Sequence, residues 1–160
     1  MKNIRLMQKS DLDALSKIYA EVYRVFDVGE KWTQESAYSL LNYWLNRQPD
    51  LCFLAECDNE IVGAFVAGIK PWWNGNHLVD GEIFVDPQYQ KRGIGKELTK
   101  TMFKNAIEKY NVKMVDGITF KRFDYPLSWY KSLGIQEVED LVVISGDIIK
   151  ALEILERENK

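Results

Sequence analysis

The spacing of apolar positions divides the first part of the chain into one strand-like and two helix-like segments. Apolar and polar residues alternate over residues 2–7, which predicts a short opening strand. Apolar residues three and four positions apart then predict an amphipathic helix that begins near Leu12. Thr33 is a suitable N-cap for a second amphipathic helix, which Pro49 ends. The N-terminal part is therefore predicted as β-α-α.

The remaining apolar pattern predicts further strands interrupted by helices. Two apolar runs joined by Asp58-Asn59-Glu60 predict a β hairpin. The whole order becomes β-α-α-β-β-β-α-β-α-β-β-α, which is typical of one mixed sheet covered by helices. We expect a single domain over residues 1–160, with a mixed α/β (α+β) fold and about seven strands. The strands expected after residue 50 cover 51–57, 61–69, 78–85, 112–120, 135–139 and 141–145, with a loop over 71–77. Helices are expected over 92–110 and 126–133, and Ser145 or Asp147 is expected to cap a last helix whose Ile148, Ile149, Leu152 and Leu155 face inward.

The composition excludes several classes of protein. Of the 160 residues, 46% are hydrophobic and 28% charged, which rules out a disordered or low-complexity chain. The 21 basic and 24 acidic residues give a net charge of −3, so we expect no nucleic-acid partner. The longest apolar run, residues 61–69, is too short to cross a bilayer, which takes about 20 residues. The first residues lack the apolar core of a signal peptide, so we expect a cytoplasmic protein without a membrane partner.

The cysteines and the histidine give no sign of a metal site. Cys52 and Cys57 are five positions apart in a predicted strand, so their side chains are expected on opposite faces and should not bridge. Their spacing matches no common set of metal ligands, and His77 is the only histidine of the chain. We therefore expect no metal and no Ser-His-Asp triad.

The segment over residues 82–98, EIFVDPQYQKRGIGKEL, carries the clearest chemical pattern. A strand ends there, a short loop follows, and Arg92-Gly93-Ile94-Gly95 opens an amphipathic helix. The first helical turn has backbone N–H groups without intrahelical partners, and two glycines let a phosphate approach them closely. The spacing fits neither a P-loop nor the dinucleotide fingerprint, whose third glycine is Leu98 here. The segment predicts a pyrophosphate-binding turn. The alternative is that both glycines only allow the helix to pack tightly on a strand.

Two motifs give the chain a resemblance to the GNAT superfamily of acyl-CoA-dependent N-acetyltransferases. The first, Val85-Asp86-Pro87 followed by Gln90-Lys91-Arg92-Gly93-Ile94-Gly95, is similar to the family's Gln/Arg-x-x-Gly-x-Gly/Ala turn after a strand. The second, Trp129-Tyr130-Lys131-Ser132-Leu133-Gly134-Ile135, is similar to the family's aromatic-Tyr-x-x-x-Gly-Phe block, with Ile135 in place of Phe. The resemblance implies a mixed, mostly antiparallel sheet that is flanked by helices and splayed in the middle to admit acyl-CoA.

The resemblance also implies that acetyl-CoA is the acyl donor. Its pyrophosphate is expected on the backbone amides of the glycine-containing turn, and its pantetheine arm along the strand before that turn. The residues expected to bind it are Ile83, Phe84, Val85, Gln90, Lys91, Arg92, Gly93, Ile94, Gly95 and Lys96.

Two residues are candidates for proton transfer. The resemblance implies that Tyr130 is the general acid that protonates the departing thiolate; the alternative is a tyrosine packed in the core. A base must take a proton from the acceptor ammonium, and Glu82, three residues before Val85, is the candidate; the alternative is an exposed or substrate-facing carboxylate. Strand alternation puts Glu82 and Phe84 on one face and Ile83 on the other. The weaker candidates for the base are Asp80, Asp116, Asp124 and His77.

The resemblance implies that the acceptor site is built by the first two helices and by loops around the central strands. Aromatic residues with nearby carboxylates suit a cation, so a small cationic amine is the favoured acceptor. A protein or peptide amine is the alternative, and a CoA-binding sensor or interaction module without catalysis is another. Since many relatives dimerise, a homodimer is also expected. The acceptor-site candidates are Phe26, Glu30, Trp32, Trp72 and Trp73.

Overall fold

The structure is a computed structural model that describes residues 2–157. The chain divides into two compact units, one that ends at Asp124 and one that begins at Tyr125. The first unit holds a sheet with three long helices. The expectation of a single domain over the whole chain stays a prediction.

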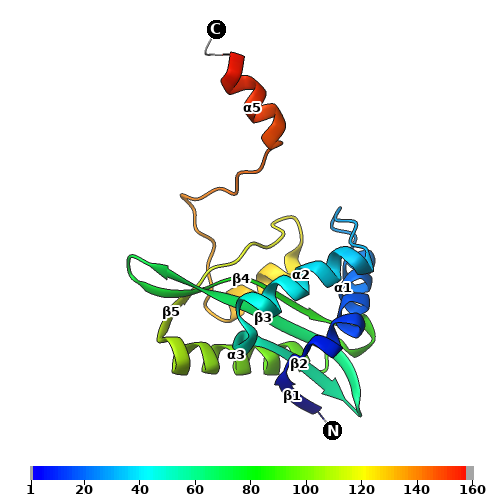
Figure 1. Ribbon diagram of the computed structural model, residues 1–160. Helices are drawn as coiled ribbons and strands as arrows, with labels where there is room; N and C mark the ends of the chain where they lie inside the picture. Colours follow the sequence, from blue (N-terminus) through cyan, green and yellow to red (C-terminus); the bar gives the residue numbers. More distant parts are fainter. Residues whose placement is uncertain (1, 158–160) are drawn as a thin grey trace. The chain divides into compact units, whose positions relative to one another are not determined.

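The first unit is built on five strands. They are β1 (Lys2–Leu6), β2 (Cys52–Cys57), β3 (Glu60–Trp72), β4 (Gly75–Val85) and β5 (Val112–Val115). The strands lie in chain order across one sheet (Figure 1); the first four pair antiparallel, and β5 pairs parallel to β4. The mixed, mostly antiparallel sheet is therefore confirmed.

Helices cover both faces of this sheet. α1 (Leu12–Phe26) and α2 (Gln34–Arg47) pack on one face, and α3 (Ile94–Tyr110) packs on the other. Each of the three begins and ends close to the predicted bounds. Thr33 caps α2 as expected, because its hydroxyl accepts a hydrogen bond from the Ser36 amide at 3.1 Å. Three single-turn 3-10 helices connect the elements: η1 (Lys9–Asp11), η2 (Pro49–Leu51) and η3 (Pro87–Tyr89).

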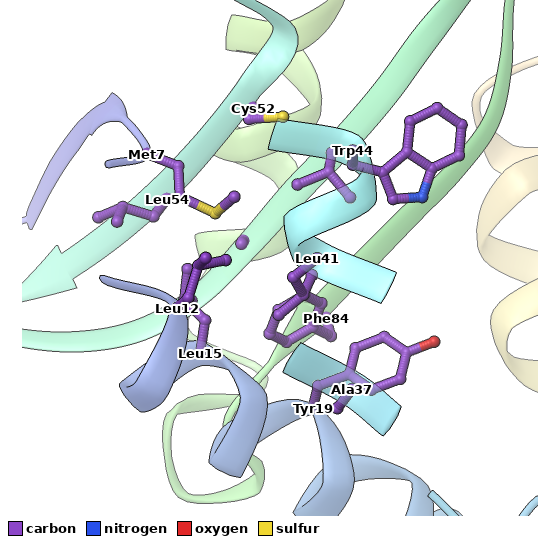
Figure 2. Packing of buried hydrophobic residues seen from close by; sticks show 12 residues of the cluster. Met7, Leu12, Leu15, Tyr19, Ala37, Leu41, Trp44, Cys52, Leu54 and Phe84 are labelled. Atoms are coloured by element: carbon purple, nitrogen blue, oxygen red, sulfur yellow. The ribbon is translucent and has the colours of Figure 1, made fainter. Parts of the chain in front are cut away.

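Two hydrophobic clusters hold the helices on the sheet. The cluster under α1 and α2 includes Leu15, Leu41 and Phe84 (Figure 2), and each fully buried leucine contributes about 1.5–3 kcal/mol relative to an exposed one. The second cluster lies between the other sheet face and α3. Cys52 belongs to the first cluster and Cys57 to the second, and both are free. The prediction that the cysteines face opposite sides and do not bridge is confirmed.

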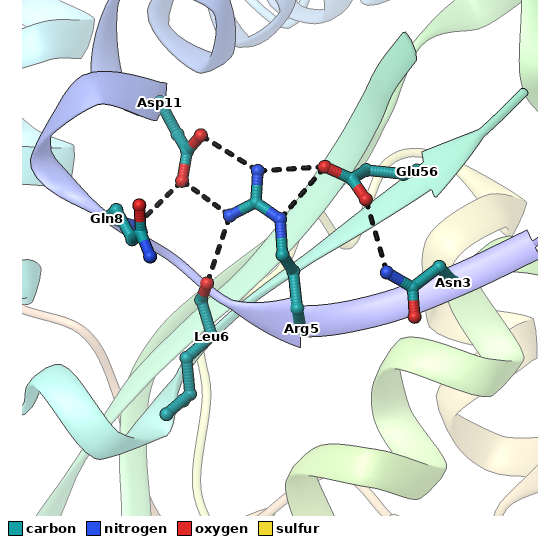
Figure 3. A network of polar contacts seen from close by, with 6 residues as sticks. All are labelled: Asn3, Arg5, Leu6, Gln8, Asp11 and Glu56. Carbon is teal, nitrogen blue, oxygen red and sulfur yellow. Dashed lines mark hydrogen bonds and ion pairs between the residues drawn. The ribbon is translucent and has the colours of Figure 1, made fainter. Parts of the chain in front are cut away.

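Arg5 ties β1 to β2 and to the start of α1 (Figure 3). Its guanidinium donates to both carboxylate oxygens of Asp11, at 2.8 and 2.9 Å, and to Glu56 Oε1 on β2 at 2.8 Å. The hydrogen bond from Arg5 is the main cause that lowers the pKa of Asp11 and of Glu56. This pairing therefore stabilises the fold above the ordinary carboxylate pKa range and is lost as the pH falls through the lowered pKa values.

The hairpin between β3 and β4 is longer than predicted. The loop expected over residues 71–77 is wrong, since β3 continues to Trp72 and β4 begins at Gly75. These two residues pair across the strands, and Gly75 adopts a φ of 127°, which closes the hairpin tightly. The Pro, Gly and Asn of this stretch indicate a loop locally, but cross-strand pairing extends the ladder through them.

The second unit contains α5 (Ile148–Arg157) and, from Tyr125 on, α4 (Asp124–Ser132). Gly134 ends α4 with a φ of 80°, as expected from its position. Asp147 caps α5, because its Oδ1 accepts hydrogen bonds from two amides of the first turn. Both helices were expected from the apolar spacing and are confirmed.

The strands expected over 135–139 and 141–145 are not formed, so the sheet has five strands rather than about seven. β-branched residues favour a strand, but a strand also needs a neighbour, and neither segment pairs within the described residues. The inward face expected for α5 stays a prediction. Its Ile148, Ile149, Leu152 and Leu155 are 56–81% exposed.

Candidate active site

A bulge in β4 places Glu82 on the side of the sheet that carries α1. On β3, Val66 pairs with Glu82 and Gly68 pairs with Val79. Two positions on β3 thus correspond to three on β4, so β4 contains one extra residue. Leu78, before the bulge, packs on the α3 side, whereas Phe84, after it, packs with α1 and α2. Strict alternation would put these two side chains on the same face. Beyond the bulge the predicted alternation is confirmed, with Ile83 and Val85 on the α3 side.

Glu82 lies against two tyrosines of α1. Tyr19 Oη donates a hydrogen bond to Glu82 Oε2 at 3.0 Å, and Tyr23 Oη reaches the same oxygen at 3.4 Å. Burial raises the pKa of Glu82, both hydroxyls lower it, and the negative charge of Glu30 raises it, with a net upward shift. A half-buried carboxyl with a raised pKa has the properties of a general base near neutral pH.

Trp32 and Glu30 complete an acidic and aromatic cluster around these tyrosines. The Trp32 ring stands edge-on to Tyr19, with 5.1 Å between centroids, and tilted to Tyr23 at 5.9 Å. Trp32 Nε1 donates to Glu30 Oε2 at 2.6 Å. The structure thus brings together Glu82 and two of the residues expected at the acceptor site. Ring faces and carboxylates attract cations, so the cluster is suited to bind one.

The glycine-containing turn opens α3 with backbone amides that have no intrahelical acceptors. Gly93 is the N-cap, with a φ of 79°, and the first intrahelical bond joins Glu97 N to Gly93 O at 3.1 Å. The amides of residues 94–96 therefore point out of the helix end, where the helix dipole adds positive potential. A Cβ on Gly95 would meet no described atom within 4 Å. The interpretation that Gly95 serves tight helix packing is therefore wrong.

Side chains of the turn hydrogen-bond to the last residue of β4 and within the turn itself. Gln90 Nε2 donates to the Val85 carbonyl at 3.0 Å. The Arg92 guanidinium donates to the Gln88 carbonyl at 3.0 Å and lies over the Tyr89 ring, 5.0 Å from its centroid. Lys91 and Lys96 are exposed beside the free amides, and both add positive charge. An anion such as a pyrophosphate fits this turn.

β4 loses its β5 neighbour before it reaches Glu82. The pairing between the two strands covers only Asn76 to Leu78, and the Asp116 amide donates to the Leu78 carbonyl at its end. The strand expected over 112–120 therefore stops at Val115. In the part of the chain that the structure describes, the edge of β4 on the β5 side has no strand partner from residue 79 on. This divergence is the expected splay, and an extended arm of a ligand can pair there as an added strand does.

Two aromatic candidates for the acceptor site lie away from this cluster. Trp72 and Trp73 are at the tip of the β3–β4 hairpin, which Figure 1 shows at the opposite end of the sheet from α1, and they are 51% and 88% exposed. His77 is buried near the same tip. Its Nδ1 lies 2.6 Å from Asp116 Oδ2, and its Nε2 lies 2.7 Å from Asn74 Oδ1. Both ring nitrogens of His77 thus contact protein oxygens.

The remaining candidates occupy other positions. Phe26 ends α1, with its ring edge-on to Phe123 at 6.0 Å. Tyr130 lies on α4 in the second unit, where its ring packs 5.0 Å from the neighbouring indole. Asp124 is exposed at the start of α4, and the side chain of Asp80 lies outside what the structure describes. The roles expected for these residues stay predictions.

Sequence reasoning missed the contact of Tyr19 with Glu82. The apolar spacing of the first helix includes Tyr19, which predicts a core residue, and the side chain is indeed 1% exposed. Its hydroxyl nevertheless reaches a carboxylate on β4. The available signal is the pair Tyr19 and Tyr23, which an i, i+4 spacing puts on the same helix face.

Within residues 2–157, no helix is both long and apolar enough to span a bilayer. Over the same range, no three His, Cys, Asp or Glu side chains gather as ligands for a metal ion.

Comparison with known proteins agrees with this geometry. Residues 12–134 match the model of the acetyltransferase (GNAT) family. The chain is 30% identical over 142 residues to an uncharacterized N-acetyltransferase of Methanocaldococcus jannaschii, a match that covers 85% of this chain and 61% of that protein. The chain thus spans about three fifths of the length of this relative. The chain therefore belongs to the GNAT family of acetyltransferases.

Solved structures show the same fold at low sequence identity. A possible acetyltransferase from Clostridium difficile 630 has a TM-score of 0.75 at 18% identity, over 92% of this chain and 98% of that one. The aminoglycoside N-acetyltransferase AAC(6')-Iy, solved in complex with CoA, has a TM-score of 0.68 at 21% identity, over 91% of this chain and 95% of that one.

Proposed function

We propose that the protein is an N-acetyltransferase that moves an acetyl group from acetyl-CoA to a primary amine by direct attack in a ternary complex. The observation that carries the proposal is Gly95, whose missing Cβ serves no packing contact in the described structure and leaves the α3 amides open to a ligand. A residue without a side chain is most useful where a ligand approaches the backbone closely.

The residues of the first unit fit acetyl-CoA. The amides of residues 94–96 and the exposed Lys91 and Lys96 would hold its pyrophosphate. The unpaired edge of β4 near Ile83, Phe84 and Val85 would receive its pantetheine arm. When bound, acetyl-CoA supplies the acetyl group as an activated thioester.

Two side chains supply the proton transfers in this proposal. Glu82 is the general base that removes a proton from the acceptor ammonium, because a protonated amine has no lone pair for attack. Its raised pKa, caused mainly by burial, matches this task. Tyr130 is the general acid that protonates the thiolate, and this assignment rests on the resemblance of the Trp129 to Ile135 motif.

The proposed acceptor is a small molecule with a cationic amine. The carboxylates of Glu82 and Glu30 and the ring of Trp32 support it, since negative charge and an aromatic ring both favour a cation. A peptide amine is the competing acceptor, and it needs space for a chain on both sides of the reacting nitrogen. The proposed compartment is the cytoplasm, where reducing conditions suit the two free, buried cysteines.

A homodimer is also part of the proposal. The second unit exposes Leu141, Val142, Val143 and Ile144 at 69–89%. Contiguous exposed apolar residues mark interaction surfaces, and the same surface on a second copy has matching apolar character.

Calorimetric titration with acetyl-CoA tests the binding turn. We expect Gly95→Val to raise the Kd by at least about tenfold while the midpoint of thermal unfolding stays the same, because the added side chain blocks only the ligand. Gly117→Val is the matched control, since Gly117 also has open space around it. Equal Kd values for Gly95→Val and the original protein would overturn the binding turn.

Acetyl transfer is tested by release of free thiol from acetyl-CoA. The acceptors are spermidine, kanamycin and a peptide with a free N-terminus. Turnover of spermidine or kanamycin supports the proposed acceptor class, and turnover of the peptide alone overturns it. Binding of acetyl-CoA without transfer to any amine would indicate a CoA-binding sensor instead.

A further inference from the structure

The hydroxyls of both α1 tyrosines contact the same carboxylate oxygen of Glu82. Tyr19 Oη and Tyr23 Oη lie 3.0 and 3.4 Å from Oε2, and among the described side chains none donates a hydrogen bond to Oε1. The ring of Tyr19 is fixed between three aromatic neighbours: it stacks on Tyr23 at 4.7 Å and meets Trp32 and Phe84 edge-on at 5.1 and 5.0 Å. The position of the donor to Oε2 is therefore set by packing, and the two carboxylate oxygens are not equivalent.

The hydroxyls of Tyr19 and Tyr23 are protonated near neutral pH and therefore act as hydrogen-bond donors there. Burial is the main cause that raises the pKa of both Tyr19 and Tyr23, and the negative charge of Glu82 raises it further. The two hydroxyls also interact with each other. A phenol that stays protonated cannot compete with Glu82 for the acceptor proton, and it can only donate to the carboxylate.

The other elements around Glu82 add few titratable groups. α2 and β3 contribute mainly apolar side chains to the cluster, such as Leu41 and Val66, together with the half-buried Tyr38. Glu30, in the loop after α1, is the remaining charge that acts on Glu82, and it raises the pKa of that carboxyl. The hydrogen bonds from α1 are thus what keeps the carboxylate form accessible at a half-buried position.

We propose that Tyr19 and Tyr23 are positioning residues that hold Glu82 by Oε2 and leave Oε1 as the atom that takes the acceptor proton. In this step the N–H bond of the acceptor ammonium breaks and an O–H bond forms at Oε1. The ammonium becomes a neutral amine with a free lone pair, and the carboxylate becomes a carboxylic acid. The proposal rests on the proposed function, because Glu82 has a proton to take only if an amine is the acceptor.

A ¹³C NMR titration of glutamate-labelled protein tests the contact without any turnover. Glu82→Gln identifies the Glu82 carboxyl signal. We expect Tyr19→Phe to raise its pKa by about one unit and Tyr23→Phe to raise it by less, since a hydrogen bond to the charged form is lost and the Tyr23 contact is longer. A variant that merely loosened the packing would admit water and lower the pKa toward its ordinary value. Either a lowered or an unmoved pKa in Tyr19→Phe would overturn the proposal.

Tyr110→Phe is the matched control. Tyr110 Oη donates to Asp50 Oδ2 at 2.7 Å, so this variant also removes a hydrogen bond between a tyrosine and a carboxylate, but on α3. We expect the Glu82 pKa to stay unchanged in Tyr110→Phe. Far-UV circular dichroism of each variant confirms that it is folded before its titration is compared.

The pH dependence of kcat/KM gives the catalytic part of the test, with the amine identified by the thiol-release screen. Loss of activity on the acid side follows protonation of the base, so this limb moves to higher pH in Tyr19→Phe by the same shift as the NMR pKa. If the NMR pKa moves and the limb does not, Glu82 is not the base and the catalytic inference is overturned, although acetyl transfer itself stands. If no amine is acetylated, the proposed function fails, while the NMR shift still decides whether the tyrosines hold Glu82.

Discussion

At the scale of a single residue, Glu82 has opposite effects on proton transfer and on folding. Its pKa is raised in the folded chain, mainly by burial, so folding disfavours the carboxylate form. The stability that a raised pKa contributes is fully present below the unfolded value of about 4.3 and is lost as the pH rises through the folded value. The charged base that catalysis needs near neutral pH is therefore a destabilising group there.

Glu82→Gln is expected to make the protein more stable than the original at about pH 7.5, and the difference should vanish toward about pH 3, where the carboxyl is protonated in both states. Urea unfolding at both pH values measures it. Glu56→Gln is the control of opposite sign, because Arg5 lowers the pKa of Glu56 and the substitution weakens that pairing near neutral pH. A stability gain from Glu82→Gln that is equal at both pH values would contradict the linkage.

Where a proposed role depends on backbone groups, the sequence was sufficient to predict it. The open amides at Gly93 and Gly95 are predictable, because glycine spacing at a helix start reports on local conformation alone. The contact between Tyr19 and Glu82 joins residues 63 positions apart. No local pattern specifies such a pairing, since it depends on the register of β4 and on how α1 packs on the sheet.

At the scale of the element, the bulge in β4 decides which side of the sheet carries Glu82. Gly81 makes it possible, because a Cβ there would lie 2.9 Å from the Val66 carbonyl oxygen and 3.0 Å from the Ala67 Cβ. Both neighbours belong to β3, whose backbone is held by the sheet, so they have little room to move. The orientation of the candidate base thus depends on a residue without a side chain next to it in sequence.

We expect Gly81→Ala to destabilise the protein by about 1–3 kcal/mol, as overpacking in a core does, and to reduce kcat in the same variant because Glu82 shifts. Urea unfolding and the thiol-release assay measure the two effects. Gly117→Ala adds the same methyl group in open space and should change neither. A Gly81→Ala variant with full stability would show that the bulge relaxes without strain.

The elements themselves were largely predictable where local signals are strong. Thr33 caps α2, and Asp58 and Asn59, both with positive φ, close the β2–β3 hairpin, as the sequence indicates. The bulge was not predictable from the sequence. An extra residue in a strand becomes evident only from the residues that it pairs with on the neighbouring strand. The extension of β3 to Trp72 depends on its pairing with Gly75 in the same way.

At the scale of the whole molecule, the apolar residues are divided unequally between the two units. Both buried clusters draw their members from the first unit, between Met7 and Ala106. In the second unit, large apolar side chains from Val138 to Leu155 are mostly exposed. Their β-branched run and helical spacing led to predictions of strands and of an inward helix face. Those patterns indicate that the residues pack against another surface, but they do not specify which surface that is.

The proposed partner of this surface is a second copy, and its removal gives the last prediction. We expect the protein to be a dimer by light scattering at micromolar concentration. The double variant Val142→Asp, Ile144→Asp should raise the dimer Kd by at least about a hundredfold, since each buried apolar side chain contributes about 1.5–3 kcal/mol and a buried charge opposes association. Ile107→Asp is the matched control, because Ile107 is 57% exposed on α3 and lies outside this surface. A monomeric original protein would overturn the homodimer. Equal weakening by Ile107→Asp would instead place the interface on the first unit, so the comparison of the two variants decides which surface associates.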